Sequence, residues 1–492
     1  MIIARVLAAL ASASAFVAWL IYLRADLVLS HYDARAHLVV ARRIFDNLTP
    51  GWQQIGAVWL PLPHLLQAVP LQIDAWYRTG ASASIVSIAC FGVTTYAITR
   101  AALAATGSRL GAVTAASLVA LNPNLLYVHT TPMTEPLALA GVTLVTLWLY
   151  EWVPRNQDQV PARLRVALFA TAWTRYEAWL VIVAGIAAAL YASGRIGASR
   201  NALVRRAVLL GRWPAAAVLL FLFLSRLTTG DWLTTSFYVP DAYYDGQLAR
   251  AWLAVWWGTH QLSTRATEAI AIGAAVLVAA RALASRGHAA MLVLLAPFAA
   301  AIAPAYAFYE GHPFRIRYML PLVVACALCG GIAVGFLRRQ AAIVTAGLLV
   351  GIMLIQSPPW RQDAPVIVEA QLDRPLRAAR REVTACLRSG YRGGRILASM
   401  GSLAHYMQEL SQAGFAIADF VHEGNGVLWT DALDQGPRPP IAWVLVEEEA
   451  EGGDVLARRL RHEPRFGRDL VRVCEGGGVA LYRVTLQTAS RR

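Results

Sequence analysis

The feature that most limits the fold of this chain is a series of apolar runs, each about as long as a membrane span. A helix needs roughly 20 apolar residues to cross the hydrocarbon core of a bilayer. Such runs recur from the N-terminus to residue 357, with short polar connections between them. They predict about eleven spans, near residues 6–23, 81–104, 110–128, 134–153, 163–173, 178–193, 207–226, 267–284, 289–309, 318–337 and 341–357.

Two apolar segments differ from an ordinary span. The stretch 56–73 is interrupted by Pro61, Pro63 and Pro70, and proline breaks helices. We therefore expect it to lie at the membrane interface or to re-enter the membrane. The first run contains Ala-x-Ala patterns typical of signal-peptide cleavage, but it continues without a break to Tyr22. We interpret it as an uncleaved first span.

The composition of the chain changes once, near Ser357-Pro358-Pro359-Trp360. Charged residues make up 15% of the whole sequence, against about 25% in a typical soluble domain, and the deficit lies before Trp360. We therefore predict a polytopic transmembrane domain over residues 1–358 and a soluble domain over residues 359–492.

The soluble tail alternates short strands and helices. Residues 396–398 and 441–446 read as strands, 403–412 as a helix, and Asp454 is suited to cap a helix that runs through Arg461. The glycine-rich stretch 475–478 predicts a turn between two further strands. The expected fold class is thus an α-helical polytopic membrane protein with a small C-terminal α/β domain.

The positive charges of the chain indicate its topology. The net charge is +14, but the arginines lie mostly in short connections between apolar runs, so we exclude nucleic acid as a partner and expect membrane lipids instead. The set of connections that is richer in arginine should be cytoplasmic. That orientation places the N-terminus in the cytoplasm and the segments 24–80, 227–266 and 360–492 on the outer, periplasmic side of a bacterial inner membrane.

The sequence contains five cysteines, and none of them indicates a metal or redox centre. Cys326 and Cys329 form a C-x-x-C pattern inside an apolar run without other ligands nearby, so we interpret them as core residues. Cys386 and Cys474 both lie in the soluble tail. Whether they form a disulfide is left open by the sequence.

The first outer segment carries the densest set of polar residues next to a span. Asp33 follows the first span, and an amphipathic helix with Leu38, Ile44 and Phe45 on one face comes after it. His37 lies four residues after Asp33, so the two share a helix face. Asp33 has two interpretations that can both hold: a catalytic carboxylate, or the N-cap of this helix.

Further charged residues lie at the ends of later spans, where ionisable groups are functional candidates. Glu135 is either such a group or an acid that complements a helix N-terminus. Arg175 and Glu177 form either a functional site or a structural ion pair. Arg315 and Arg317 flank the start of another span, as ligand-binding cations or as interfacial anchors.

This layout resembles the GT-C superfamily of membrane glycosyltransferases, which includes protein O-mannosyltransferases, aminoarabinose transferases of lipid A and bacterial family-39-like relatives. The resemblance covers the whole chain in architecture. In residues it rests on 31–64, Thr134-Glu135-Pro136, Thr174-Arg175-Tyr176-Glu177 and Arg315–Tyr318. Many relatives carry a DE or DD pair in the first outer loop, whereas Ala34 follows Asp33 here, so the second acid of that pair is missing.

The resemblance implies a transferase that moves a sugar from a polyprenyl-phosphate donor to a hydroxyl acceptor, which is a glycan, a lipid or a protein. It places Asp33 and Glu135 as candidate catalytic acids. The candidate substrate-binding residues are His37, His64, Arg175, Glu177, Arg315 and Arg317. A carboxylate can accept the proton of the attacking hydroxyl, and arginines can stabilise the leaving phosphate.

Three alternatives stay open at this stage. Asp33, His37, His64 and Glu135 are chemically able to bind a divalent cation, and no other cofactor motif is present. A transporter or flippase of lipid-linked saccharides would carry charges at the membrane midplane and repeated halves, neither of which the sequence displays. A non-catalytic envelope assembly factor would use the soluble domain as its binding module.

Overall fold

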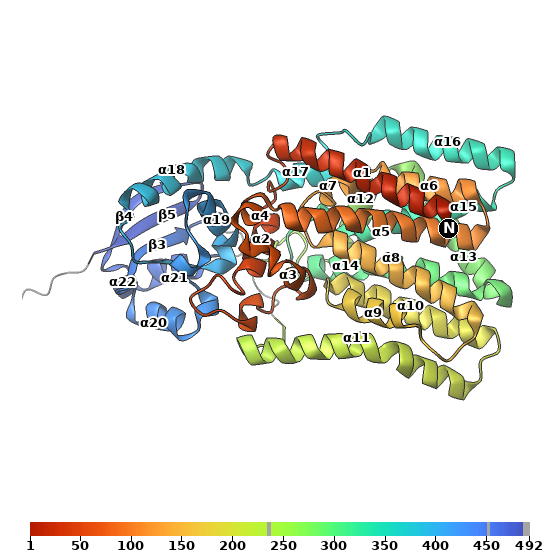
Figure 1. Cartoon of the computed structure of the whole chain (residues 1–492), viewed down its shortest axis with the longest axis horizontal. Helices are drawn as coiled ribbons and strands as arrows, with labels where there is room; N and C mark the ends of the chain where they lie inside the picture. Colours follow the sequence, from red (N-terminus) through yellow and green to blue (C-terminus); the bar gives the residue numbers. More distant parts are fainter. Residues whose placement is uncertain (234–237, 450–452, 486–492) are drawn as a thin grey trace, which may run out of the picture.

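The structure of the chain is a computed structural model, which describes residues 1–233, 238–449 and 453–485. Its helices run side by side along the long axis, and a small domain with a sheet lies at one end (Figure 1). The N-terminus lies at the opposite end of the helical part. The predicted fold class, a polytopic α-helical membrane protein with a small C-terminal α/β domain, is confirmed.

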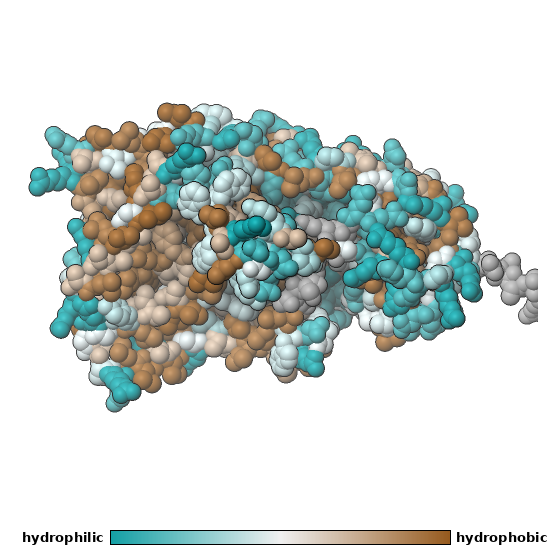
Figure 2. Space-filling model, turned by 180° about the vertical axis from the view of Figure 1, so that it is seen from behind, coloured by the Kyte–Doolittle hydropathy of each residue, from teal (hydrophilic) through white to brown (hydrophobic). Residues whose placement is uncertain are grey.

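Nine helical segments within the described ranges are long and apolar enough to cross a membrane. They are α1 (Ile2–Arg24), α5 (Ala81–Thr106), α8 (Glu135–Trp152) with its extension η3 (Val153–Arg155), α10 (Tyr176–Arg195), α11 (Arg200–Thr229), α13 (Arg265–Ala284), η4 (Arg286–Ala301) with α14 (Ile302–Tyr309), η5 (Ile316–Met319) with α15 (Leu320–Phe336), and α16 (Arg339–Gln356). Figure 2 shows that hydrophobic residues cover much of the helical part on that face, whereas hydrophilic residues dominate the C-terminal domain.

Two of the predicted spans are shorter helices. The run 110–128 is divided into α6 (Arg109–Ala120) and α7 (Pro123–Val128). α6 ends at Ala120, and Asn122 caps α7, because its side chain accepts hydrogen bonds from the backbone N–H groups of Asn124 and Leu125. The run 163–173 becomes α9 (Ala162–Ala172), whose 11 residues extend over about 16 Å. Eleven crossings therefore stay a prediction, with α6 and α9 as the two short ones.

The segments that join the helices at the end next to the C-terminal domain contain further short helices. The first segment forms α2 (Tyr32–Arg42), η1 (Trp52–Ile55), α3 (Leu62–Gln67), η2 (Pro70–Gln72) and α4 (Asp74–Thr79). These elements lie between the helical part and the C-terminal domain (Figure 1). The proline-interrupted stretch 56–73 accordingly forms no continuous span. A later segment contains α12 (Leu248–Ser263), which exposes Trp252, Trp256 and Trp257.

The C-terminal domain has the predicted alternation of strands and helices. Its elements are α18 (Arg374–Gly390), β1 (Arg395–Ala398), α19 (Met400–Leu410), η6 (Ser411–Ala413), η7 (Ile417–Asp419), β2 (Phe420–Val421), η8 (Glu423–Asn425), α20 (Val427–Gln435), β3 (Ile441–Glu447), α21 (Val455–His462), α22 (Pro464–Gly467), β4 (Leu470–Gly476) and β5 (Val479–Val484). As expected, Asp454 caps α21, since its side chain accepts a hydrogen bond from the Ala457 N–H.

The five strands form one mixed sheet in the order β2-β1-β3-β5-β4. β1 pairs in parallel with β2 and β3, whereas β5 pairs antiparallel with β3 and β4. The predicted glycine turn joins β4 to β5. Helix α18 packs against this hairpin, and Gly477 is required there, because a Cβ atom at this position would lie 2.2 Å from the Leu376 carbonyl oxygen.

The C-terminal domain is docked on the first segment through polar contacts. The Asn47 amide lies 3.0 Å from the His422 ring, and the Gln54 amide donates to the Gly424 carbonyl at 2.7 Å. Between the last span and α18 lies α17 (Pro365–Ala370), which is tied to α7 by a hydrogen bond from the Val366 N–H to the Asn124 side chain. The boundary at residue 358 stays a prediction, but α17 packs with the helical part.

The cysteines divide into two groups. Cys90, Cys326 and Cys329 are buried thiols, in agreement with core positions. Cys386 of α18 and Cys474 of β4 form a disulfide. Structural disulfides persist in oxidising compartments; the outward orientation of the domain stays a prediction.

We predict that protein isolated from intact cells carries one disulfide, between Cys386 and Cys474. Non-reducing peptide mapping should identify it and should find the other three cysteines as thiols. Because the bond closes a loop of 88 residues, the Cys386→Ser variant should lose on the order of 4 kcal/mol of domain stability, visible as a lower unfolding temperature. The Cys90→Ala variant is the control and should retain the bond. Two free thiols at 386 and 474 would contradict the outward orientation.

Candidate functional site

Arg317 occupies the centre of a buried ion cluster at the end of the helical part nearest the C-terminal domain. It lies in η5, one turn before α15, and only 4% of its side chain is exposed. Its guanidinium contacts the carboxylate of Asp33 from α2, lies 3.2 Å from Glu135 at the start of α8, and donates to Glu369 of α17 at 2.7 Å. One cation therefore joins three segments that are far apart in the sequence.

Arg175 is the second cation of the cluster. It immediately precedes α10, and its guanidinium lies 3.1 Å from Glu135 and 2.9 Å from Glu177. It also donates to the Thr134 hydroxyl at 2.9 Å. The predicted Arg175–Glu177 ion pair is thus present, and the Glu135 carboxylate lies between two guanidinium groups. We call Asp33, Glu135, Arg175, Glu177, Arg317 and Glu369 the ion cluster.

The start of α2 fixes the position of Asp33. His31 is the N-cap residue, because its Nδ1 accepts a hydrogen bond from the Asp33 N–H at 3.0 Å. The interpretation of Asp33 as N-cap is therefore wrong: Asp33 lies in the first turn of the helix, where a carboxylate complements the helix dipole. Glu135 has the corresponding position in α8, so its interpretation as a helix N-terminal acid is correct alongside its ion pairs.

Glu369 is a member of the cluster that the sequence analysis missed. One of its oxygens accepts a hydrogen bond from the Ile316 N–H at 2.6 Å, and the other contacts Arg317. Burial would raise the pKa of this carboxyl, but the Arg317 guanidinium and His31 lower it to about 2. The carboxylate is therefore charged at every physiological pH. Its signal in the sequence was weak: an acid next to the apolar stretch 366–368, just after the last span.

The cluster contains four carboxylates and two guanidinium groups. Burying charges is costly unless they are paired, and within this cluster the carboxylates outnumber the guanidinium groups. Among the described residues, neither oxygen of Glu135 has a hydrogen-bond donor in good geometry. Asp33 is more accessible than Glu135: 16% of the Asp33 side chain is exposed, against 4% for Glu135.

The two histidines of the predicted site, His37 and His64, lie together. His37 Nδ1 and His64 Nε2 are 3.1 Å apart, and His64 Nδ1 lies 3.1 Å from the Leu60 carbonyl oxygen. The Trp59 ring packs on His37 at 4.2 Å between ring centroids. Burial lowers the pKa of His64 to about 3 and that of His37 well below its ordinary value. The pair is therefore uncharged at neutral pH.

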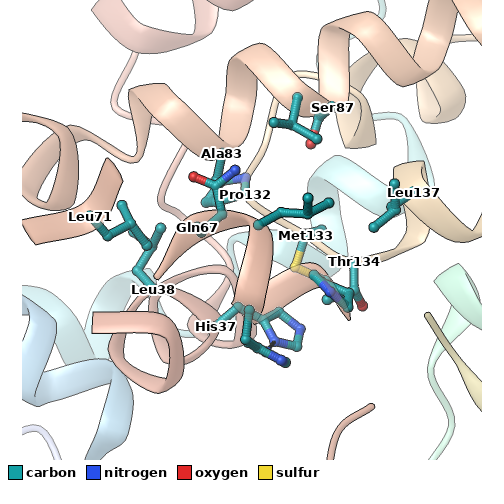
Figure 3. Close-up of a pocket in the computed structure, with 14 residues that line it drawn as sticks. His37, Leu38, Gln67, Leu71, Ala83, Ser87, Pro132, Met133, Thr134 and Leu137 are labelled. Atoms are coloured by element: carbon teal, nitrogen blue, oxygen red, sulfur yellow. Dashed lines mark hydrogen bonds between the residues drawn. The ribbon is translucent and has the colours of Figure 1, made fainter. Parts of the chain in front are cut away.

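Two cavities adjoin the cluster. The first has His37, His64, Thr134 and Leu137 in its wall, and Figure 3 shows its lining residues from α2, α5 and the segment 132–134. The second has the charged groups of Glu135, Arg175, Glu177 and Arg317 in its wall, and its other lining residues are Ala138, Leu139, Val142, Ala178, Val181, Ala300 and Pro321. Thr134 separates the two cavities, because it lines the first and accepts a hydrogen bond from Arg175, which lines the second.

Arg315 takes a different position from Arg317. Its Nε donates to the Tyr32 hydroxyl at 3.2 Å, so it lies beside the first turn of α2. The structure thus joins Asp33, Glu135, Arg175, Glu177 and Arg317 through ion pairs, places His37 and His64 in the adjoining cavity, and leaves Arg315 next to Tyr32.

The residues suggested for a divalent cation do not fit one as the structure arranges them. Asp33 and Glu135 both face the Arg317 guanidinium, while His37 and His64 face each other. No group of three or more His, Cys, Asp and Glu side chains in the described part of the chain is arranged to hold a metal ion.

Solved structures of similar architecture exist, whereas no protein family model matches the chain and no curated protein sequence matches it significantly. The chain is similar to the crystal structure of ArnT from Cupriavidus metallidurans in the apo state. The likeness covers 95% of this chain and 98% of that one, with 12% sequence identity and a TM-score of 0.49. A likeness at this level carries no assignment of activity or of site residues.

The buried, uncharged His64 predicts an acid-sensitive fold. Its pKa in the folded protein is about 3 against about 6.5 in an unfolded chain, so the neutral ring contributes stability that is complete above pH 6.5 and is lost as the pH falls toward 3. At pH 5 the loss amounts to about 2 kcal/mol. The His64→Gln variant, which cannot take up this proton, should show a flatter dependence of unfolding temperature on pH between 7 and 5.

The exposed His462 provides the matched control. The His462→Gln variant should follow the wild-type curve. If the unfolding temperatures of wild type and His64→Gln fall in parallel between pH 7 and 5, another group causes the acid sensitivity.

Proposed function

We propose that the protein is a glycosyltransferase that moves a sugar from a polyprenyl-phosphate donor to a hydroxyl acceptor at the outer face of a bacterial inner membrane. The observation that carries this proposal is the ion cluster. Asp33 from the first outer segment pairs with Arg317, and Glu135 joins Arg317 to Arg175 at the charged end of a cavity between membrane helices. A transporter would need comparable charges along a path through the helices, whereas these charges gather at one end of them.

The second cavity suits the donor by its chemistry. Its walls from α8, α10, η4 and α15 are mainly aliphatic, as an isoprenoid chain requires, and its charged end contains Arg175 and Arg317. Guanidinium groups are well suited to phosphate. A donor that reaches the site from the membrane needs no nucleotide-binding domain, which agrees with the absence of such a motif in the sequence.

The proposed reaction is a direct displacement at the anomeric carbon. The acceptor oxygen forms the new glycosidic bond, the bond between the anomeric carbon and the phosphate oxygen breaks, and Asp33 accepts the proton of the hydroxyl. Protonation removes the negative charge of Asp33 beside Arg317 just as the leaving phosphate gains negative charge. The same guanidinium can therefore exchange one anionic partner for the other and stabilise the transition state.

Glu135 has a different role in this proposal. Because it lies between Arg175 and Arg317 and is almost fully buried, it holds the two guanidinium groups in place. The uncharged His37–His64 pair lines the neighbouring cavity, where it can contact the acceptor. The acceptor is a glycan, a lipid or a protein, and the sugar is a pentose or a hexose.

A direct test uses the purified protein in liposomes supplied with polyprenyl-phosphate sugars and a panel of hydroxyl acceptors. Formation of a glycosylated acceptor together with free polyprenyl phosphate would support the proposal. Movement of the intact donor between leaflets without glycoside formation would instead identify a flippase. Donor binding without either process would identify an assembly factor.

The Asp33→Asn variant tests the proposed base. The substitution keeps the size of the side chain and removes its basicity, and His31 rather than Asp33 caps α2, so the fold should persist. General-base assistance is typically worth about 10² to 10⁴ in rate, and turnover should fall within that range while donor affinity changes little. A rate above about a tenth of wild type would exclude Asp33 as the base and make Glu135 the next candidate.

Asp26→Asn is the matched control for this experiment. Asp26 is an exposed acid at the end of the first span with a left-handed backbone conformation (φ 56°), which asparagine tolerates as well as aspartate does. Its substitution should leave turnover close to that of wild type.

A further inference from the structure

Helix α2 carries two ionic residues that point in nearly opposite directions. Asp33 and Arg35 are two residues apart, which corresponds to about 200° around a helix. Asp33 contacts Arg317 of the membrane part. Arg35 contacts Asp373, which immediately precedes α18, and Glu409 of α19. The helix that carries the proposed base is therefore held from both sides.

The contacts of Arg35 form a closed and charge-balanced network. Arg35 and Arg380 both have fully buried side chains, and each pairs with Asp373 and with Glu409. Arg380 lies on α18 and Glu409 on α19, two helices of the C-terminal domain. Two buried cations thus face two largely buried anions, and removal of one partner leaves an uncompensated charge.

The segment between the last span and α18 reinforces this arrangement. It carries Glu369, which bonds to Arg317 and to the Ile316 N–H, and four residues later Asp373, which bonds to Arg35. One short stretch therefore places a carboxylate on each side of α2. A shift of the C-terminal domain would move the partners of Arg35 and, through this stretch, the partner of Arg317.

We propose that Arg35 is a positioning residue: by docking the C-terminal domain on α2, it holds Asp33 against Arg317 in the geometry that the reaction needs. The inference rests on the proposed function and assigns the C-terminal domain a role in it. In this role the domain completes the support of the helix that carries the base.

The first experiment needs no substrate. Hydrogen exchange of the full-length protein should show faster exchange of the α2 amides, residues 32–42, in Arg35→Met than in wild type. The charge-balanced double variant Arg35→Met/Glu409→Gln removes one cation and one anion, and it keeps the measurement interpretable if the single variant folds poorly. Unchanged exchange in α2 of the double variant would overturn the proposal.

The second experiment measures turnover. A misplacement of about 1 Å in a catalytic group can reduce the rate about 100-fold, so kcat of the double variant should fall 10- to 100-fold while KM for the polyprenyl-phosphate sugar changes less than threefold. Added to Asp33→Asn, the same two substitutions should cause no further loss, because Arg35 acts through Asp33. A further loss of tenfold or more in that background would show that Arg35 acts independently of the base.

Arg377→Met is the matched control. Like Arg380, Arg377 lies on α18. It pairs with Asp26 of the membrane part, but this pair is exposed. Exposed ion pairs contribute little to stability, so exchange in α2 and turnover should both match wild type. If Asp33→Asn proves fully active, the proposed base fails while the exchange experiment still reports on the docking. If Asp33→Asn is inactive and the double variant is fully active, the positioning role of Arg35 fails alone.

Discussion

The structure depends on how a buried arginine at the end of a membrane helix is kept charged. Removing a guanidinium from water is costly, and the cost is offset only by closely paired anions. Arg317 obtains these anions from α2, α8 and α17, so the requirement to neutralise one cation fixes the relative positions of three elements. The acids in turn depend on Arg317, since four carboxylates gathered without it would repel one another. The cluster thus fixes the relative positions of these elements and also concentrates charged groups at one site.

Part of this cluster could be predicted from the sequence, for a physical reason. Placing an ionisable residue in or near the membrane costs free energy. Asp33, Glu135, Arg175 and Arg317 therefore stood out beside the apolar runs. Glu369 was not, because acids are common in a soluble tail and nothing local distinguishes this one. The same holds for Arg35, whose partners Asp373 and Glu409 lie more than 330 residues away in the sequence. Contacts over such separations leave no periodic pattern.

Two differences between the structure and the sequence analysis have local causes. Asp33 was a reasonable N-cap candidate because aspartate is among the preferred cap residues, but a histidine two positions earlier takes that role through its ring nitrogen. The run 110–128 was interpreted as one span because its residues are apolar on both sides of Asn122. The pair Asn122-Pro123 contained the correct signal, since a capping side chain followed by proline is typical of a helix start.

The spacing of the cluster along the chain has a consequence for how the protein is made. Asp33 and Arg317 are separated by 284 residues, and ribosomes add about 5 to 20 residues per second, so Asp33 emerges some 15 to 60 s before its partner. Glu369 is synthesised later still. During this interval the early spans are already in the bilayer, and their terminal carboxylates remain hydrated at its surface. The site therefore closes as a late step of biogenesis, when the last span is inserted and the segment behind it folds back onto the first.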